Sequence, residues 1–170
     1  MKSKEKSIEE IRKELHRHID NICDSILAEL SGAHYAEGMD GIRLSTNAGH
    51  FKGKKPKAVL FPDSRKIDVR TWKEVVFILL TDCVSDPNRM QYLLKLRGRV
   101  FGKQRVILAD TPQRMSQPMQ ICDRLWMETK YDTETLLKVL MFRIFDVVGY
   151  DYGGIRIILR EDGGSDAVSK

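Results

Sequence analysis

This chain of 170 residues has few of the features that mark a secreted, membrane-spanning or metal-binding protein. Its three cysteines, Cys23, Cys83 and Cys122, are widely spaced and form no Cys-x-x-Cys pair, which argues against a disulfide framework and a cysteine zinc knuckle. The longest apolar run, Val75–Leu80, is far shorter than the roughly 20 residues that a membrane span needs, and Met1–Lys13 holds no apolar signal region. We therefore expect a cytoplasmic protein with no membrane association.

Motifs for nucleotide binding, metal binding and nucleophilic catalysis are also missing. Gly49–Lys55 is rich in glycine and lysine but lacks the GxxxxGK[ST] order of a P-loop. His16, Asp20 and Cys23 would share one face of a helix, yet a metal site there would need a fourth ligand that the sequence does not supply. The two histidines of the glycine-rich segment have no serine or cysteine nucleophile near them in a triad motif. The sequence predicts no cofactor.

Positive charge is concentrated in the middle of the chain. Residues 52–105 hold fourteen basic and five acidic residues, a net charge of +9, whereas the rest holds fifteen basic and nineteen acidic residues, a net charge of −4. A basic block interleaved with aromatic residues is typical of a surface that contacts phosphate. The alternative is that its lysines merely protect and solubilise a sheet edge. The predicted nucleic-acid contacts are Lys52, Lys54, Lys55, Lys57, Arg97, Arg99, Lys103 and Arg105.

An amphipathic helix is predicted for residues 1–30, because apolar residues recur there every three or four positions. Such a stripe needs a cover, which either the same chain, a second copy or a partner protein can supply. We therefore expect this helix to mediate homo-oligomerisation or docking. Its apolar stripe consists of Ile8, Ile11, Leu15, Ile19, Ile22, Ile26 and Leu30.

The rest of the chain divides into a loop, a domain and a tail. Residues 31–50 are glycine-rich and without a sustained period, which predicts a loop with one short strand at 41–45. Residues 51–160 are predicted to form an α+β domain, a mostly antiparallel sheet covered by helices. Residues 161–170 are polar and predict a flexible tail.

The domain's first half shows a hairpin followed by two helices. Ala58–Phe61 and Lys66–Val69 flank a Pro-Asp turn, and a Thr-x-x-Glu capping box at Thr71 opens a helix that runs to about Val84. A second helix is predicted from Pro87, capped by Asp86, to Gly98. In the second half, two strands are predicted at Arg105–Asp110 and Leu125–Lys130, joined by a connection over Thr111–Asp123. A helix follows, capped by Asp132 or Thr133 and ended by Gly149. The last predicted strand is Ile155–Leu159.

One arrangement is typical of an enzyme. Asp110 ends one predicted strand, and Glu128 and Lys130 lie two apart on the next, where alternation puts them on the same face. Two carboxylates can hold Mg²⁺ while a lysine orients a water, as metal-assisted phosphodiester hydrolysis requires. This pattern is similar to that of PD-(D/E)xK nucleases, although Ala109 stands where those enzymes have proline.

Two stretches, Gly53–Glu74 and Leu125–Tyr150, resemble a small uncharacterised bacterial α+β domain that is often attached to an N-terminal helical segment. The shared marks are a Gly-x-x-Pro before a hairpin, a tryptophan at the start of the next helix, and a strand with Glu-Thr before a later helix. The likeness covers Phe51–Leu159. It implies the α+β fold and a setting among restriction, defence and mobile-element genes. An asparagine usually stands at the position of Lys130, which argues against an ExK catalyst.

Three functional hypotheses follow. The first is a non-catalytic nucleic-acid-binding accessory or regulatory protein of a bacterial defence or mobile-element system, with DNA and RNA both open. The second is a protein-interaction or scaffolding module acting through the N-terminal helix. The third is a Mg²⁺-dependent nuclease that uses Asp110, Glu128 and Lys130.

Overall fold

The computed structural model describes residues 14–19, 22, 41–102 and 105–160. The chain separates into two compact units, Met1–Asp40 and Gly41–Lys170. Of the predicted N-terminal helix, residues 14–19 and 22 are described and helical. The other stripe positions, the loop up to residue 40 and the tail at 161–170 lie outside the described residues.

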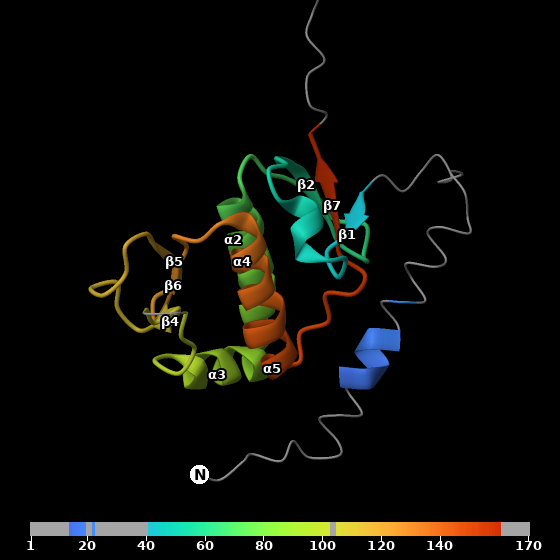
Figure 1. The fold of residues 1–170 in the computed structure, drawn as a ribbon. Helices are drawn as coiled ribbons and strands as arrows, with labels where there is room; N and C mark the ends of the chain where they lie inside the picture. Colours follow the sequence, from blue (N-terminus) through green and yellow to red (C-terminus); the bar gives the residue numbers. More distant parts are fainter. Residues whose placement is uncertain (1–13, 20–21, 23–40, 103–104, 161–170) are drawn as a thin grey trace, which may run out of the picture. The chain divides into compact units, whose positions relative to one another are not determined.

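Two antiparallel sheets form in residues 41–160, where the sequence predicts one. The first sheet has the strand order β1–β7–β2–β3 and the second β4–β6–β5 (Figure 1). Every neighbouring pair is antiparallel. The strands are β1 (Ile42–Arg43), β2 (Pro56–Leu60), β3 (Lys66–Asp68), β4 (Leu108–Ala109), β5 (Pro118–Cys122), β6 (Leu125–Glu128) and β7 (Arg156–Leu159).

The predicted connection over Thr111–Asp123 contains a strand that the sequence analysis did not predict, because β5 lies inside it and pairs with β6. The first position of β5 is Pro118, which is tolerated at the start of a strand. From Met119 to Ile121 the side chains are partly buried, exposed and buried in turn, and the register shifts before Cys122, so the alternation is too brief for a clear sequence signal. The two strands that were predicted here are also shorter than expected, since β4 has two residues and β6 ends at Glu128.

The helices begin where the sequence predicts, because side-chain caps define them. Thr71 Oγ1 accepts a hydrogen bond from the Glu74 N–H at 3.2 Å, and Asp132 Oδ1 accepts one from the Thr135 N–H at 3.0 Å, so Asp132 is the cap of the last helix. Gly149, at φ +70°, ends that helix in the left-handed conformation. The helical elements are η1 (Ala48–Phe51), α2 (Trp72–Val84), α3 (Pro87–Leu96), α4 (Thr133–Lys138), η2 (Val139–Phe145) and α5 (Asp146–Val148).

The last three of these elements form one continuous helix whose middle, η2, is wound as a π-helix. The Asp146 N–H donates to the Met141 carbonyl, five residues earlier. Phe142 and Arg143 both face solvent from this segment. The Arg143 guanidinium donates to the Phe101 carbonyl and so ties the helix to the chain that leads into β4.

One face of the first sheet joins the core. Val59 lies opposite both Ile67 and Ile157, and Ile157 lies opposite Ile42, so one apolar row crosses all four strands. The helices α2 and α4 lie on one side of this sheet (Figure 1), and their buried side chains belong to the same core cluster as Val59 and Ile157. No described helix is long and apolar enough to cross a membrane.

The compact unit starts at Gly41, ten residues before the predicted domain boundary at residue 51. The short predicted strand at 41–45 is present as β1, which pairs with β7. Leu44 and Ala48 are buried in the core, so the described end of the predicted glycine-rich loop is part of the domain.

Candidate nucleic-acid interface

The first sheet has a second face, on the side away from α2 and α4 (Figure 1). Because successive side chains of a strand point to opposite sides, Ala58 and Leu60 face away from the core that Val59 enters. On β7 the same alternation turns Arg156 and Ile158 outward. Leu60 and Ile158 are partly exposed and belong neither to the core nor to the apolar side chains packed against it. We call this the outer sheet face; around the completely buried Ala58 it carries Arg43, Leu60, Lys66, Asp68, Arg156 and Ile158.

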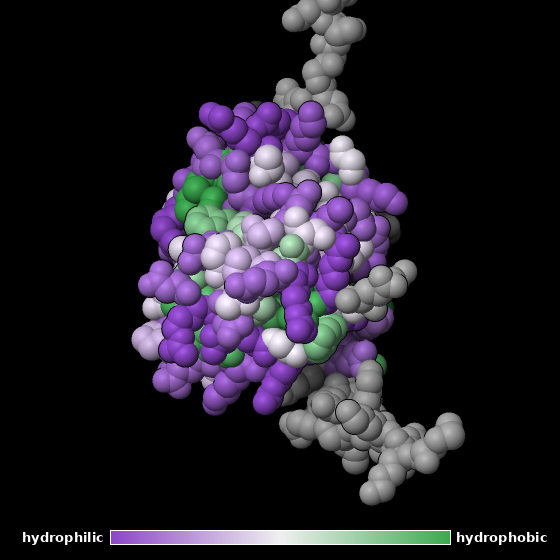
Figure 2. All heavy atoms as spheres, turned by 90° about the vertical axis from the view of Figure 1, so that its left-hand side faces the viewer, coloured by the Kyte–Doolittle hydropathy of each residue, from purple (hydrophilic) through white to green (hydrophobic). Residues whose placement is uncertain are grey.

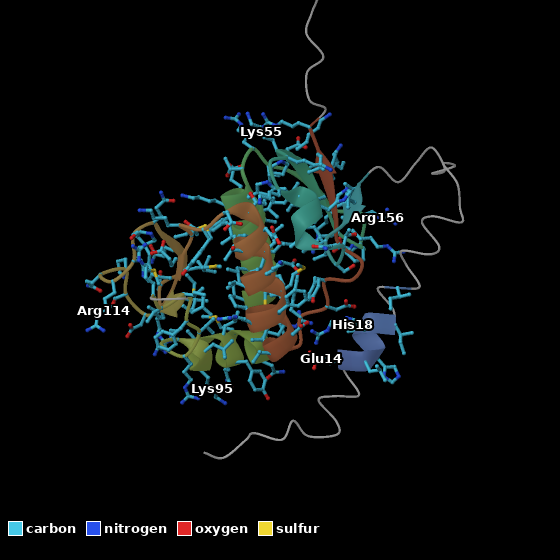
Figure 3. All side chains as sticks on the ribbon, in the orientation of Figure 1. Glu14, His18, Lys55, Lys95, Arg114 and Arg156 are labelled. Atoms are coloured by element: carbon cyan, nitrogen blue, oxygen red, sulfur yellow. The ribbon has the colours of Figure 1, made fainter. Side chains whose placement is uncertain are left out.

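Three cationic side chains form a row across the outer sheet face. Arg43 lies directly opposite Arg156, and Leu60 lies opposite both Arg156 and Lys66. Adjacent strands are about 4.8 Å apart, so the row from Arg43 to Lys66 spans roughly 14 Å. Arg156 lies on the side of the sheet away from α2 and α4 (Figure 3). Its Nη1 donates to the Gly41 carbonyl at 3.1 Å, a contact that holds the guanidinium near the start of β1.

Four of the predicted lysines lie at one end of the same sheet, and we call this part the lysine segment: Lys52, Lys54, Lys55 and Lys57. Its backbone is held firmly. The Trp72 indole N–H donates to the Lys54 carbonyl at 2.7 Å, and the Trp72 ring packs against Phe51 with centroids 5.2 Å apart. Trp72 therefore positions the segment from a half-buried site. Within the part of the chain that the structure describes, none of these four ammonium groups forms an ion pair with a carboxylate.

Arg160 connects the lysine segment to the outer sheet face. Its backbone N–H donates to the Lys55 carbonyl at 2.8 Å, and its Nε donates to the Pro56 carbonyl at 3.2 Å. Arg160 follows Arg156 by four residues, an even number, so it continues the outward-facing set of β7 about 13 Å further along. The outer sheet face, Arg160 and the lysine segment together are the basic sheet surface. Asp68 is the one carboxylate that the described residues place on its outer sheet face.

The other predicted nucleic-acid residues lie elsewhere. Arg97, Arg99 and Arg105 follow α3, which starts at the far end of α2 from Thr71, and a helix of that length measures about 20 Å. The Arg97 guanidinium donates to the Leu94 and Arg124 carbonyls, so it closes α3 and ties it to the turn between β5 and β6. Arg99 and Arg105 are exposed, and Lys103 lies outside the described residues. The seven described residues of the eight predicted ones therefore do not form one surface.

The side of the molecule that carries the second sheet is predominantly hydrophilic. Figure 2 shows it largely covered by polar side chains, with hydrophobic ones in small separate areas. Large contiguous apolar patches are the usual mark of a stable protein interface, and this side does not present one.

The nuclease candidates are placed differently from the predicted arrangement. The Glu128 N–H donates to the Ile107 carbonyl at 2.8 Å, and Asp110 lies three residues beyond Ile107, about 10 Å further along the strand. Glu128 is completely buried, whereas Asp110 and Lys130 are exposed. Lys130 follows the end of β6, so Glu128 and Lys130 do not stand side by side on one strand face. No group of three or more His, Cys, Asp or Glu among the described residues is arranged to hold a metal ion.

The Glu128 carboxylate has backbone partners instead. It accepts hydrogen bonds from the N–H groups of Ser116, Gln117 and Lys130, the last two at 2.9 Å. Burial raises the pKa of Glu128, but these three backbone donors outweigh burial and leave its pKa below the ordinary value. The carboxylate thus anchors the connection between β4 and β5 to the end of β6.

Sequence reasoning missed Arg43, Lys66, Arg156 and Arg160 as members of a candidate site. A signal was present in β7, where Ile155, Ile157 and Leu159 alternate with Arg156. That alternation places the arginine opposite to the core face, but it does not indicate which strands lie beside it.

Comparison with known proteins gives no relative from which a function can be taken: no family model, curated protein or solved structure matches this chain. The likeness to the bacterial α+β domain stays a prediction. The function is therefore argued from the basic sheet surface.

Proposed function

We propose that this protein binds nucleic acid through the phosphate backbone, with the basic sheet surface as the contact, and acts without catalysis as an accessory or regulatory component of a bacterial nucleic-acid-handling system. The observation that carries the proposal is the cationic row Arg43–Arg156–Lys66 on the outer sheet face, continued by Arg160 and the lysine segment. The setting in defence or mobile-element systems comes from the sequence resemblance alone.

Charge supports this surface as an anion site. Arg43 lies directly opposite Arg156, and Leu60 separates Arg156 from Lys66 in the same row, so three cationic side chains lie on neighbouring strands. Several lysine and arginine contacts to phosphate release condensed counterions, which makes binding strong at low salt and weak at high salt.

The first test compares two charge-reversal variants of the full chain that alter net charge equally. The site variant is Lys55→Glu/Lys57→Glu/Lys66→Glu, and the matched control is Lys95→Glu/Arg114→Glu/Arg124→Glu. All six side chains are exposed. In fluorescence anisotropy titrations with labelled DNA and RNA, the site variant should bind about 100-fold more weakly and its salt slope should fall by about 3, one unit for each lost phosphate contact.

The control should stay within about threefold of the parent protein, because it removes charge away from the proposed contact. Circular dichroism and thermal unfolding confirm that both variants are folded. Equal losses in the two variants would mean that net charge alone drives binding, and the surface assignment would then be wrong. A third variant, Arg99→Glu/Arg105→Glu, tests the two exposed candidates that lie outside the basic sheet surface. If only this variant loses nucleic-acid binding, the site lies in the segment between α3 and β4.

A further inference from the structure

We infer that the basic sheet surface takes double-stranded nucleic acid and reads no base sequence. This rests on the proposed function and specifies its substrate class. The basis is the chemistry of the outer sheet face, which carries cationic and aliphatic side chains, one carboxylate, and no aromatic, amide or hydroxyl side chain among the described residues.

Single strands are held by a different chemistry. Proteins that bind them combine a basic groove with aromatic rings on which unpaired bases stack. Beside the lysine segment, Phe51 and Phe61 are buried, and Trp72 packs on Phe51 while its N–H donates to the Lys54 carbonyl. The exposed His50 ring meets Phe51 edge-on, with centroids 6.2 Å apart. Leu60 and Ile158 provide aliphatic surface without a π-face. The outer sheet face thus offers charge to a single strand but no aromatic ring for stacking.

Base readout also lacks its usual donors and acceptors. Adenine is recognised by asparagine or glutamine, and neither occurs on the outer sheet face; guanine is recognised by the two-pronged guanidinium of arginine. The Arg156 guanidinium donates one hydrogen bond to the Gly41 carbonyl, and the Arg160 guanidinium donates one to the Pro56 carbonyl. What remains of these groups suits a phosphate oxygen, which needs fewer aligned donors than a base edge.

The spacing of the cations favours a duplex. They cover an area of roughly 14 Å across the strands and 13 Å along them, and the strand pairing fixes the backbone positions of Arg43, Arg156 and Lys66. Double-stranded DNA carries about one charge per 1.7 Å of its axis from two backbones, so a fixed array reaches more phosphates on a duplex than on one flexible strand. Binding that depends on charge alone should therefore be tighter for the duplex.

The test titrates the full chain with labelled 20-base-pair DNA duplexes of two unrelated sequences, each of their separated strands, and a duplex RNA, at about 50 and 150 mM salt. The two DNA duplexes should bind within about threefold of each other, and each should bind at least tenfold more tightly than its own single strands. The site variant Lys55→Glu/Lys57→Glu/Lys66→Glu should weaken both duplexes by the same factor.

The outcomes separate the two proposals. Single strands that bind as tightly as duplexes, or one duplex preferred more than tenfold over the other, would overturn the duplex inference while leaving nucleic-acid binding intact. No binding to any nucleic acid at low salt would overturn the proposed function, and binding to phosphatidylglycerol vesicles in its place would assign the surface to membranes. Equal binding of duplex RNA and duplex DNA supports recognition by charge; a strict preference for one contradicts it.

Discussion

Glu128 shows how a residue chosen as a catalytic candidate takes a structural role. Its buried carboxylate accepts hydrogen bonds from three backbone N–H groups. Two of them, of Ser116 and Gln117, lie just before β5, and the third, of Lys130, lies just after β6. Hydrogen bonds to a charged group contribute about 1.5–3 kcal/mol each relative to their loss, and unsatisfied buried donors add a further cost. The second sheet therefore depends on this carboxylate being present and ionised.

Replacing Glu128 with glutamine should lower the free energy of unfolding by about 2–3 kcal/mol at pH 7, because the amide cannot accept hydrogen bonds at both positions. The folded-state pKa lies below the ordinary value of 4.5, so the contribution of the carboxylate is fully present above that pH and is lost as the pH falls through the folded pKa. The free energies of unfolding of Glu128→Gln and the parent, measured in urea, should thus converge as the pH falls from 4.5 through the lower folded-state pKa of Glu128.

Glu134→Gln is the matched control for this comparison. Glu134 makes an ion pair with Lys138 one helical turn away at a partly exposed position, and such pairs contribute about 0.3–0.5 kcal/mol. A loss in Glu128→Gln no larger than in Glu134→Gln would contradict the anchoring role.

The buried environment of Cys83 makes its thiol unreactive. The side chain is completely buried, and burial raises the pKa of its thiol to about 12. The reactive form of cysteine is the thiolate, so this thiol is unreactive near neutral pH. Packing in the core accounts for Cys83.

At the start of α4, Asp132 and Thr133 are both residue types that can cap a helix, and the structure shows which of them does. Asp132 accepts hydrogen bonds from both the backbone N–H and the hydroxyl of Thr135, at 3.0 and 2.7 Å. These bonds lower the pKa of Asp132, so the cap is ionised at neutral pH. Thr133 is the first residue of α4, one position past the cap.

Asp132→Ala should destabilise the protein by about 1 kcal/mol, since the cap satisfies a donor that the helix cannot satisfy itself. Thr133→Ala should cost only a few tenths of a kcal/mol, because alanine is a good residue inside a helix. Thermal or urea unfolding of the two variants decides between them. A larger loss of stability for Thr133→Ala than for Asp132→Ala would show that Asp132 is not the cap.

At the level of the domain, the two sheets share one core. Val59 and Ile157 from the first sheet and Leu108 and Met127 from the second belong to a single buried cluster. Lys73, at the start of α2, donates to the side chain of Gln117 just before β5. Sheets that share a core in this way are expected to unfold together.

A chain of residues 41–170 should therefore fold without residues 1–40 and unfold in one cooperative transition. It should also bind duplex DNA within about threefold of the full chain, because the basic sheet surface belongs to this unit. Calorimetry, light scattering and anisotropy measure these properties. Two separate transitions would contradict the shared core, and loss of binding would give residues 1–40 a direct part in it.

Much of the local structure was predictable from the sequence because neighbouring residues determine it. The hairpin of β2 and β3, the caps Thr71, Asp86 and Asp132, and the helix end at Gly149 all depend on hydrogen bonds or dihedral angles within a few residues. The strand β5 and the division into two sheets were not predictable, because a short strand becomes recognisable only through the partner beside it.

The candidate surface divides in the same way. The sequence determined that Lys52, Lys54, Lys55 and Lys57 are close together and solvated, because chain connectivity and charge suffice for that. The tertiary structure decided that Arg43 and Arg156, more than a hundred residues apart, lie opposite each other, and that Arg97 and Arg99 lie elsewhere. It also decided that Glu128 is buried. The physical reason is that strand register and burial arise from contacts between distant segments, which periodicity and composition do not encode.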